Sequence, residues 1–433
     1  MERTNIMRTL IQNGHVLNPS TQLDGIMDIA IENGKIVEIS EKIAASDTDL
    51  VIDAKNKYVM PGFIDLHVHY REPGFEYKET IATGSRSSAK GGYTSVCPMP
   101  NTKPAIDCKE MVQLMKEKEK TDSVVHILPV GAVTLGQNGA VVTDMKGMKE
   151  AGAVAVSEDG KSVMDVLVYV EGMKRAAQED LLVMAHCEDK ALVRGGVMNA
   201  GPYADALGLK GITNAVEDVI TARDIFLAQE TGAKLHLCHC STKDSVRLVK
   251  MAKEAGYPVT GEVCPHHFTL ADSDIPSDDA NYKMNPPLRS KQDVQVLKEG
   301  LRDGIMDVIS TDHAPHSAEE KAKSMAEAPF GIVGEETAFA LTVTELVENG
   351  YLTKMQLVEK MSYNPAKILG IDKGRLEVGK AADLVIADFD ESYEIDVQTF
   401  VSKGKNSPFH GRKVKGRIYQ TLVDGNVVYQ YEK

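Results

Sequence analysis

The 433-residue sequence contains no run of 18 apolar residues, and its first residues lack the apolar core of a secretion signal. These absences favour a soluble protein, which we expect in the cytoplasm. Basic residues are also in deficit, since 49 Lys and Arg face 63 Asp and Glu, for a formal net charge of -14. Nucleic acids and anionic membranes attract clustered positive charge, so we expect neither as a partner. A pocket can still carry local positive charge, so an anionic small-molecule substrate is compatible with this balance.

Cysteine is scarce, and the six residues form no CxxC pair. They are Cys97, Cys108, Cys187, Cys238, Cys240 and Cys264. Most lie in apolar, strand-like runs, so we expect small buried reduced thiols rather than disulfides or zinc-thiolate ligands. Reduced thiols also fit a cytosolic protein.

Both ends of the chain have a β-rich pattern. Residues 8–60 alternate apolar and polar side chains and are broken by Asn-Gly or Asn-Lys pairs, a pattern typical of β-hairpins. Residues 366–433 repeat this character around an Asp-Gly turn. We therefore expect residues 1–60 and 366–433 to pair into one small β-sandwich beside a catalytic domain over residues 61–365.

The middle of the chain alternates near-continuous apolar runs with helical segments such as CKEMVQLMKEKEK. Apolar runs separated by helices indicate parallel strands covered on both faces. The eight predicted strands span residues 62–69, 94–100, 124–131, 153–160, 181–189, 234–241, 259–267 and 306–313. Eight such units predict an α/β fold, a (β/α)8 TIM barrel.

Histidine and aspartate side chains stand at the ends of these strands. His67 and His69 end the first strand one residue apart, so both imidazoles point to the barrel interior. His186, His239 and Asp312 end the fifth, sixth and eighth strands. Because the carboxyl ends of barrel strands converge on one mouth, these side chains predict a metal site there. Imidazole and carboxylate ligands of this kind suit zinc.

The other histidines have weaker positions. We interpret four of them as packing residues or as supports for the ligands: His236, His266, His267 and His313. His266 and His267 are predicted to end the seventh strand. No role is assigned to His15, His126 or His410.

The run PGFIDLHVHYREPGFEYKETIATGSRSSAKGGYTSVCPMPNTKP at 61–104 resembles the signature of dihydroorotases within the amidohydrolase superfamily. Four further segments resemble the same family: DVISTDHAPH, GRLEVGKAADLVIAD, MNPPLR at 284–289 and PFGIVGEET at 329–337. The resemblance covers nearly the whole chain, and its HxHxREPG part is the most specific. It implies a zinc-dependent cyclic amidohydrolase with one or two zinc ions per chain, two being favoured.

The resemblance gives ligand roles to His67, His69, His186, His239 and Asp312. The superfamily commonly adds a carboxylated lysine at the end of the fourth strand, where this chain reads AVAVSEDG. The bacterial class I dihydroorotases use an aspartate there, which implies Asp159. Lys161 remains an alternative, since alternation places Ser157, Asp159 and Lys161 on one face. The missing lysine argues against a hydantoinase or a dihydropyrimidinase.

Substrate contacts follow from the same comparison. Arg71 lies two residues beyond His69, on the same face, and a guanidinium there suits a carboxylate. The family implies that Asn101 and His316 share this carboxylate. It implies further contacts from His69, Asn285 and the backbone of Phe330 and Gly331.

The implied activity is reversible hydrolysis of (S)-dihydroorotate to N-carbamoyl-L-aspartate in UMP biosynthesis. Asp312 is the expected catalytic residue, as general base and then general acid. The polar segment 317–334 is expected to order over the substrate as a lid. The alternatives are an allantoinase-like enzyme and a non-catalytic barrel subunit of an aspartate transcarbamoylase assembly. A homodimer and an active complex with aspartate transcarbamoylase are further candidates.

Overall fold

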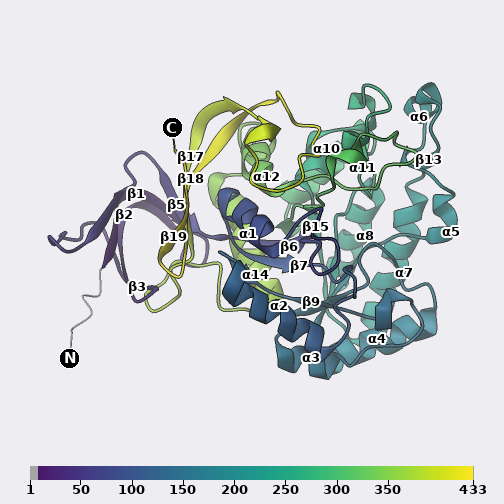
Figure 1. Ribbon diagram of the computed structural model, residues 1–433, viewed down its shortest axis with the longest axis horizontal. Coiled ribbons are helices and arrows are strands. Elements are labelled where there is room, and N and C mark those ends of the chain that lie inside the picture. The colour runs from purple at the N-terminus through teal and green to yellow at the C-terminus, as the bar shows by residue number, and fades with distance from the viewer. Residues whose placement is uncertain (1–7, 433) are drawn as a thin grey trace.

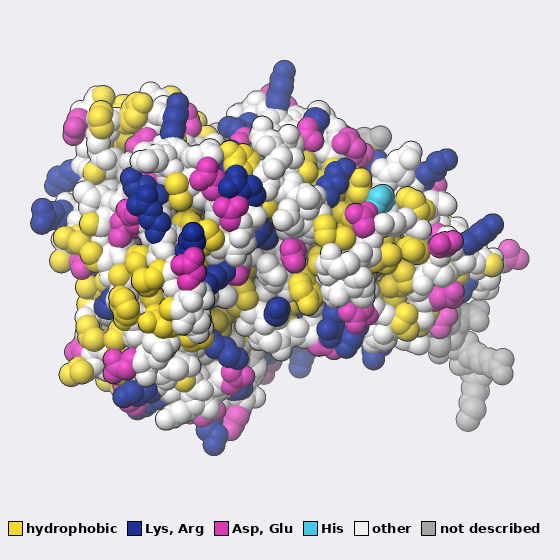
Figure 2. All heavy atoms as spheres, turned by 180° about the vertical axis from the view of Figure 1, so that it is seen from behind, with side chains coloured by type: hydrophobic (Ala, Val, Ile, Leu, Met, Phe, Trp, Pro, Cys, Tyr) yellow, Lys and Arg dark blue, Asp and Glu magenta, His cyan; other side chains and the backbone are white. Residues whose placement is uncertain are grey.

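The computed structural model describes residues 8–432, which form a barrel beside a β-rich unit (Figure 1). Among these residues, no helix is long and apolar enough to cross a membrane. On the face shown in Figure 2, acidic and basic side chains are interspersed over the surface.

The barrel strands pair in parallel, in chain order. They are β6 (Phe63–Val68), β7 (Tyr93–Pro98), β8 (His126–Ile127), β9 (Val130–Ala132), β10 (Ala155–Ser157), β11 (Leu182–Ala185), β14 (Leu235–Leu237), β15 (Val259–Val263) and β16 (Val308–Ile309). β8 and β9 act as one strand, because the two residues between them still bond to the neighbouring strands. Leu128 N donates to the Val96 carbonyl on one side, and the Pro129 carbonyl accepts from Val154 N on the other. A parallel bridge between Val68 and His313 joins the last strand to the first. The predicted (β/α)8 barrel is confirmed.

The larger helices follow the strands and cover the barrel from outside (Figure 1). They are α1 (Ile81–Lys90), α2 (Lys109–Asp122), α3 (Met145–Ala151), α4 (Val166–Gln178), α7 (Ala215–Thr231), α8 (Lys243–Glu254), α10 (Lys291–Arg302) and α12 (Glu335–Thr342). Side-chain caps fix several of their starts: Thr242 accepts from Ser245 N before α8, and Ser290 closes a capping box before α10.

Shorter elements fill the connections. The short helices are α5 (Lys190–Val193), α6 (Pro202–Leu207), α9 (Pro265–Thr269), α11 (Ala318–Lys321), α13 (Lys354–Val358) and α14 (Asn364–Leu369). β12 (Met198–Asn199) pairs with β13 (Gly211–Ile212). Single helical turns span Leu135–Gln137, Asp272–Asp274, Ala280–Tyr282, Val343–Val347, Glu359–Tyr363 and Val397–Thr399.

The β-rich unit takes strands from both ends of the chain, as predicted. Its members are β1 (Thr9–Asn18), β2 (Leu23–Glu32), β3 (Lys35–Ser40), β4 (Leu50–Asp53), β5 (Tyr58–Pro61), β17 (Leu384–Glu394), β18 (Lys413–Val423) and β19 (Asn426–Gln430). They are hydrogen-bonded in the order β19-β18-β17-β5-β1-β2-β3, with β4 beside β1. The β5–β17 pair joins the two ends, and side chains from both pack into one hydrophobic core.

Two of the expected turns close hairpins, whereas Asn13-Gly14 lies at a bulge inside β1 and Asn56-Lys57 joins β4 to β5, which both pair in parallel with β1. Asn33 and Gly34 connect β2 to β3 with φ of 52° and 75°, and Asp424 and Gly425 connect β18 to β19 with φ of 46° and 73°. Two successive left-handed residues are what a tight hairpin turn with native twist requires, and Asn-Gly and Asp-Gly adopt them readily.

Several of the predicted strands are too long, and at the seventh the difference changes the element in which two histidines lie. The seventh strand ends at Val263, and His266 and His267 lie in helix α9 instead of at the strand tip. Pro265 explains the difference, because its fixed φ suits the first position of a helix and it cannot donate to a sheet ladder.

Candidate active site

The six predicted ligands meet at the carboxyl ends of the barrel strands. His67 belongs to β6 and His69 follows it, while His186, His239, Asp159 and Asp312 follow β11, β14, β10 and β16. All six side chains are buried. His239 and Asp312 have φ of 36° and 49°. Left-handed backbone at residues other than glycine is strained, and such strain is common where a side chain must be aimed at a site.

Asp159 lies at the centre of this cluster. Its Oδ1 is 3.2 Å from His67 Nε2, 3.7 Å from His186 Nδ1 and 3.8 Å from His239 Nε2. Its Oδ2 is 3.5 Å from His69 Nε2. One carboxylate therefore faces all four histidines. His67 and His69 approach it from the end of β6, and His186 and His239 approach it from the ends of β11 and β14.

Asp312 closes the other side of the cluster. Its Oδ1 lies 3.1 Å from His69 Nε2 and 3.6 Å from His67 Nε2. Burial opposes ionisation of this carboxyl, but the close contact with His69 and the other nearby histidines lower the pKa of Asp312 to about 2. Burial likewise opposes ionisation of Asp159, and His67 and His239 hold the pKa of Asp159 well below its usual range. Both carboxylates are charged.

Several buried atoms of the cluster lack a hydrogen-bond partner among residues 8–432. They are His67 Nε2, Asp159 Oδ1, His186 Nε2 and His239 Nδ1. A buried polar atom without a partner costs about 1–3 kcal/mol, so their convergence needs an explanation. Imidazole nitrogen and carboxylate oxygen are the donors that zinc and related cations take, and the residues present fit such an ion.

Arg71 lies beside the cluster without an acidic partner. Its Nε donates to the Pro315 carbonyl at 3.2 Å, and its Nη2 is 3.3 Å from His316 Nε2. No ion pair joins this half-buried guanidinium to a carboxylate within the described part of the chain. Lys78 Nζ approaches His316 Nδ1 at 3.2 Å, and burial together with these cations lowers the pKa of His316. Glu320 pairs with Lys78 at 2.8 Å, so Arg71 is the cation of this corner that is left to bind an anion.

The remaining predicted substrate contacts already have protein partners. Asn101 Oδ1 accepts from His69 Nδ1 at 3.0 Å, and its Nδ2 donates to Asp159 Oδ2 at 3.1 Å. Asn285 Nδ2 donates to Glu188. Gly331 N donates to the Lys283 carbonyl at 3.0 Å, and the Phe330 carbonyl accepts from His316 at 2.8 Å.

The chain matches two families along its length. A family described as Dihydro-orotase-like matches residues 56–245, and the Amidohydrolase family matches residues 293–429. A dihydroorotase of Geobacillus sp. (strain WCH70) is 49% identical over 98% of this chain and 99% of its own length. A dihydroorotase of Acetivibrio thermocellus is 48% identical over 97% of this chain and 98% of its own length. The chain belongs to the dihydroorotase family.

Solved structures with the same fold come from related cyclic amidohydrolases. Dihydropyrimidinase from Brevibacillus agri NCHU1002 superposes with a TM-score of 0.86 at 26% identity, covering 98% of this chain and 95% of that one. L-Hydantoinase from Arthrobacter aurescens superposes with a TM-score of 0.86 at 28% identity, covering 98% of this chain and 96% of that one. This member of the dihydroorotase family is accordingly a cyclic amidohydrolase and a metalloenzyme that acts on a small molecule.

Within this dihydroorotase-family site, the two candidates for the central group lie apart. Asp159 is buried in the cluster, whereas Lys161 is exposed and its Nζ donates to the Gln137 carbonyl at 3.0 Å. The strand ends at Ser157, so strict alternation no longer applies two and four residues further on.

Glu262 is an important site residue that the sequence analysis missed. It lies in β15 and is fully buried. Its Oε1 accepts from His67 Nδ1 at 3.0 Å and from the backbone N of His239 at 3.1 Å, while its Oε2 accepts from His236 Nε2 at 3.0 Å. Holding Nδ1 of His67 turns its Nε2 toward Asp159. A single glutamate in the strand VTGEV was the available signal, because an unpaired charge is rarely buried in an apolar strand.

The predicted lid, residues 317–334, is anchored in this structure. Lys321 Nζ donates to the carbonyls of Lys283, Pro329 and Gly331, at 3.3, 3.1 and 2.8 Å. Met325 is fully buried in a core cluster, and its N donates to Asp278. The segment is therefore tied down at both its first helix and its end.

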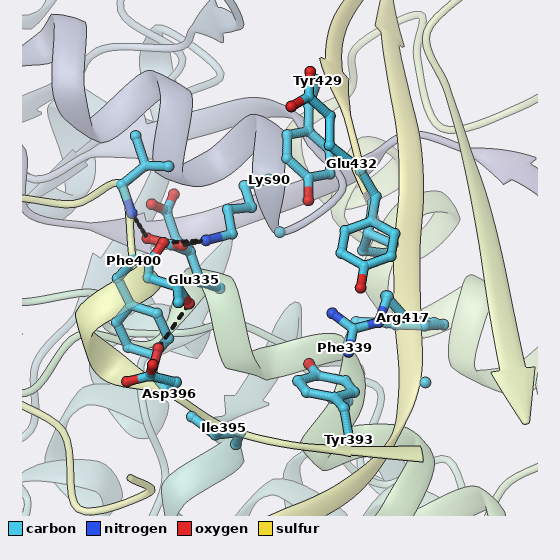
Figure 3. Close-up of a pocket in the computed structure, with 18 of the residues that line it drawn as sticks. Lys90, Glu335, Phe339, Tyr393, Ile395, Asp396, Phe400, Arg417, Tyr429 and Glu432 are labelled. Carbon is cyan, nitrogen blue, oxygen red and sulfur yellow. Dashed lines mark hydrogen bonds and ion pairs between the residues drawn. The ribbon is translucent and has the colours of Figure 1, made fainter. Parts of the chain in front are cut away.

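A separate cavity of about 630 Å³ lies at the junction of the barrel and the β-rich unit (Figure 3). Arg417 points into it, with its guanidinium carbon 3.8 Å from the Tyr393 ring centre and 4.4 Å from that of Tyr431. The predicted site residues do not line this cavity.

Proposed function

We propose that this chain catalyses the reversible hydrolysis of (S)-dihydroorotate to N-carbamoyl-L-aspartate, in the synthesis of UMP. The observation that carries the proposal is Arg71, a guanidinium without an acidic partner beside a histidine and aspartate cluster. A planar guanidinium binds a carboxylate through two parallel hydrogen bonds, and dihydroorotate carries its carboxylate next to the ring that is opened. The family names of the relatives point to the same substrate.

We also propose zinc as the metal, with two ions per chain. His67, His69 and Asp312 form one group of ligand atoms, and His67, Asp159 and His239 form another. His186 lies beside the second group, with its Nδ1 3.7 Å from Asp159 Oδ1, so these residues would hold the ions. When bound, zinc polarises the carbonyl that is attacked and makes water acidic enough to lose a proton near neutral pH.

Asp312 moves the proton in this mechanism. Its charged carboxylate accepts a proton from the attacking water and then delivers it to the departing ring nitrogen. Arg71 holds the substrate carboxylate, with His316 and Asn101 beside it, so that the ring carbonyl faces Asp312. Hydrolysis creates a new carboxylate and releases a proton, so higher pH favours ring opening and lower pH favours ring closure.

The contacts proposed for Asn285 and Gly331 require rearrangement. Asn285 would exchange its bond with Glu188 for the ring amide, and His69 would contact the substrate from the cluster side. We propose that the backbone N–H of Phe330 donates to the substrate ring. The N–H of Gly331 would do so too, once it has given up its bond to the Lys283 carbonyl.

An allantoinase-like activity is the nearest competitor, and Arg71 discriminates between the two because allantoin has no carboxylate. We expect Arg71→Met to lower kcat/KM for dihydroorotate by at least on the order of 100-fold, since a charge-assisted contact with the substrate carboxylate is lost. Allantoin turnover by the wild-type enzyme, unchanged in the variant, would contradict the assignment.

Partners and location are further proposals. We propose a cytoplasmic homodimer, with exposed apolar residues such as Leu167 of α4 and Phe226 of α7, 81% and 55% exposed, as its contact surface. An aspartate transcarbamoylase is the candidate for a larger complex. Sedimentation of the enzyme alone and with a transcarbamoylase tests both, and a monomer in each run would reject them.

The deciding experiment is to purify the enzyme without chelator, measure metal per chain and follow dihydroorotate absorbance with and without zinc. Loss of dihydroorotate that depends on the metal supports the proposal. Bound metal without turnover redirects the assignment to another cyclic amide. No metal and no turnover favours the non-catalytic barrel of an aspartate transcarbamoylase assembly.

A further inference from the structure

A second group of buried donor atoms lies where β15 ends and α9 begins. Cys264 directly precedes α9, and His266 and His267 are its second and third residues. One ligand-type atom from each residue lies within 4.8 Å of the other two. The three side chains are at most 2% exposed.

Both imidazoles keep a nitrogen without a partner. His267 Nε2 donates to the Pro286 carbonyl at 2.9 Å, which leaves its Nδ1 as an acceptor. Across residues 8–432, nothing donates to His267 Nδ1 or satisfies His266 Nε2, although both atoms are buried. Burial lowers the pKa of His267 to about 4 and that of His266 well below its usual value, so both rings are neutral and can offer a lone pair.

We propose that Cys264, His266 and His267 form a binding site for a soft divalent cation of the zinc class, apart from the ions held around Asp159. A thiolate and two imidazoles are a preferred ligand set for zinc, with a water completing the tetrahedron. Zinc bonds of this kind hold their donor atoms about 3.3–3.6 Å apart, so the side chains need only a small closing movement. Binding exchanges the thiol proton for the metal, so one proton leaves to solvent for each ion bound.

The other thiol near the cluster differs in a decisive way. Cys238 lies with His67 and Glu262 in a comparable group of donor atoms. There, however, His67 Nδ1 and Glu262 already share a hydrogen bond of 3.0 Å. The Cys264 group has no such internal bond between its donors, which is why its two nitrogens remain open.

An ion at this position would fasten the end of β15 to α9. Glu262 of β15 lies two residues before Cys264, and it holds His67 and His239. The site therefore has a structural role for the β15–α9 junction, and the inference does not depend on which ring the enzyme opens.

Anomalous diffraction tests the site directly in the unmodified enzyme. Crystals of enzyme purified without chelator and supplied with zinc are measured on both sides of the zinc absorption edge. We expect an anomalous peak bounded by Cys264 Sγ, His266 and His267, in addition to density at Asp159. An ordered water or empty density there, without anomalous signal, overturns the proposal.

Cobalt substitution tests the thiolate without relying on activity. The enzyme reconstituted with Co²⁺ is expected to show thiolate-to-cobalt charge-transfer absorption, and Cys264→Ser to lose it together with one ion per chain. Cys108→Ser, which changes a half-buried thiol on the barrel exterior, is the matched control and should keep both. Loss of the band in Cys238→Ser but not in Cys264→Ser would place the thiolate ligand elsewhere and reject the site. If Cys264→Ser does not fold, the diffraction experiment still decides.

Discussion

At the scale of single residues, Glu262 holds three histidines in and beside the site, although the sequence analysis did not name it. It accepts hydrogen bonds from two histidine rings and from the backbone of a third histidine. We expect Glu262→Gln to weaken metal binding by about 10–100-fold, because a neutral amide cannot accept all three bonds and leaves His67 free to turn. Metal retention against a graded chelator series measures this.

The control for this change is Glu254→Gln at an exposed position at the end of α8, which should bind metal as the wild type does. We expect the kcat of Glu262→Gln to fall in proportion to the metal lost per chain and to recover when excess zinc is added. That result identifies Glu262 as a positioning residue. Unaltered metal affinity in Glu262→Gln would contradict the role.

Asp159 and Lys161 provide a matched pair of predictions. Asp159→Asn should lose metal and turnover, since it removes the charge that faces all four histidines. Lys161→Ala should retain both, because its Nζ bonds to the Gln137 carbonyl outside the cluster. Metal per chain is the measurement. Full metal content in Asp159→Asn, or its loss in Lys161→Ala, would reverse the assignment.

At the scale of elements, the predicted lid depends on one buried lysine. Burial lowers the pKa of Lys321 to about 7, and its Nζ holds the carbonyls of Pro329 and Gly331. We expect Lys321→Met to speed amide hydrogen exchange across residues 317–334 and to raise KM more than it lowers kcat, because the unsatisfied carbonyls release the loop.

Lys323→Met, two residues along and exposed, is the control and should leave exchange unchanged. Added carbamoyl aspartate should slow exchange of the same segment in the wild type. Equal exchange with and without this ligand would show that the segment does not act as a lid.

The elements also show why some predictions succeed and others do not. Continuous apolar runs identify buried parallel strands, and the HxH spacing identifies inward-facing imidazoles, because both depend on local alternation. The helix containing His266 and His267 depends on how Pro265 ends a strand, which periodicity does not reveal. The partners of Asn101 and Asn285 depend on residues far away in the chain, so only the fold shows them. The domain limits at residues 60 and 365 remain predictions.

At the scale of the whole molecule, His126 links the barrel to the β-rich unit. It lies in β8, and its Nε2 is 3.2 Å from Asp383, next to β17, while its Nδ1 is 3.8 Å from Glu119. Burial opposes its charge, but these carboxylates raise the pKa of His126 to about 9. An unfolded histidine titrates near 6.5, so this stabilisation is complete below about pH 6.5 and is lost as pH rises toward 9.

We therefore expect the free energy of unfolding to fall between pH 6.5 and 9. His126→Gln should flatten this dependence while leaving the stability at pH 9 nearly unchanged. Urea unfolding across this range, followed by circular dichroism, makes the comparison. His410→Gln, an exposed histidine, is the control. Parallel pH curves for His126→Gln and the wild type would show that the link contributes nothing.

The pairing of β5 with β17 has a consequence for synthesis on the ribosome. Pro61 lies opposite Leu384, so about 320 residues must be translated between the two partners. At roughly 5–20 residues per second, the first strands emerge some 15–65 s before the strand that completes their sheet. The nascent chain must carry an open β-edge during that time, while the barrel forms between the two halves. Pausing of the ribosome before residue 384 would lengthen the interval in which this edge is open to aggregation or to a chaperone.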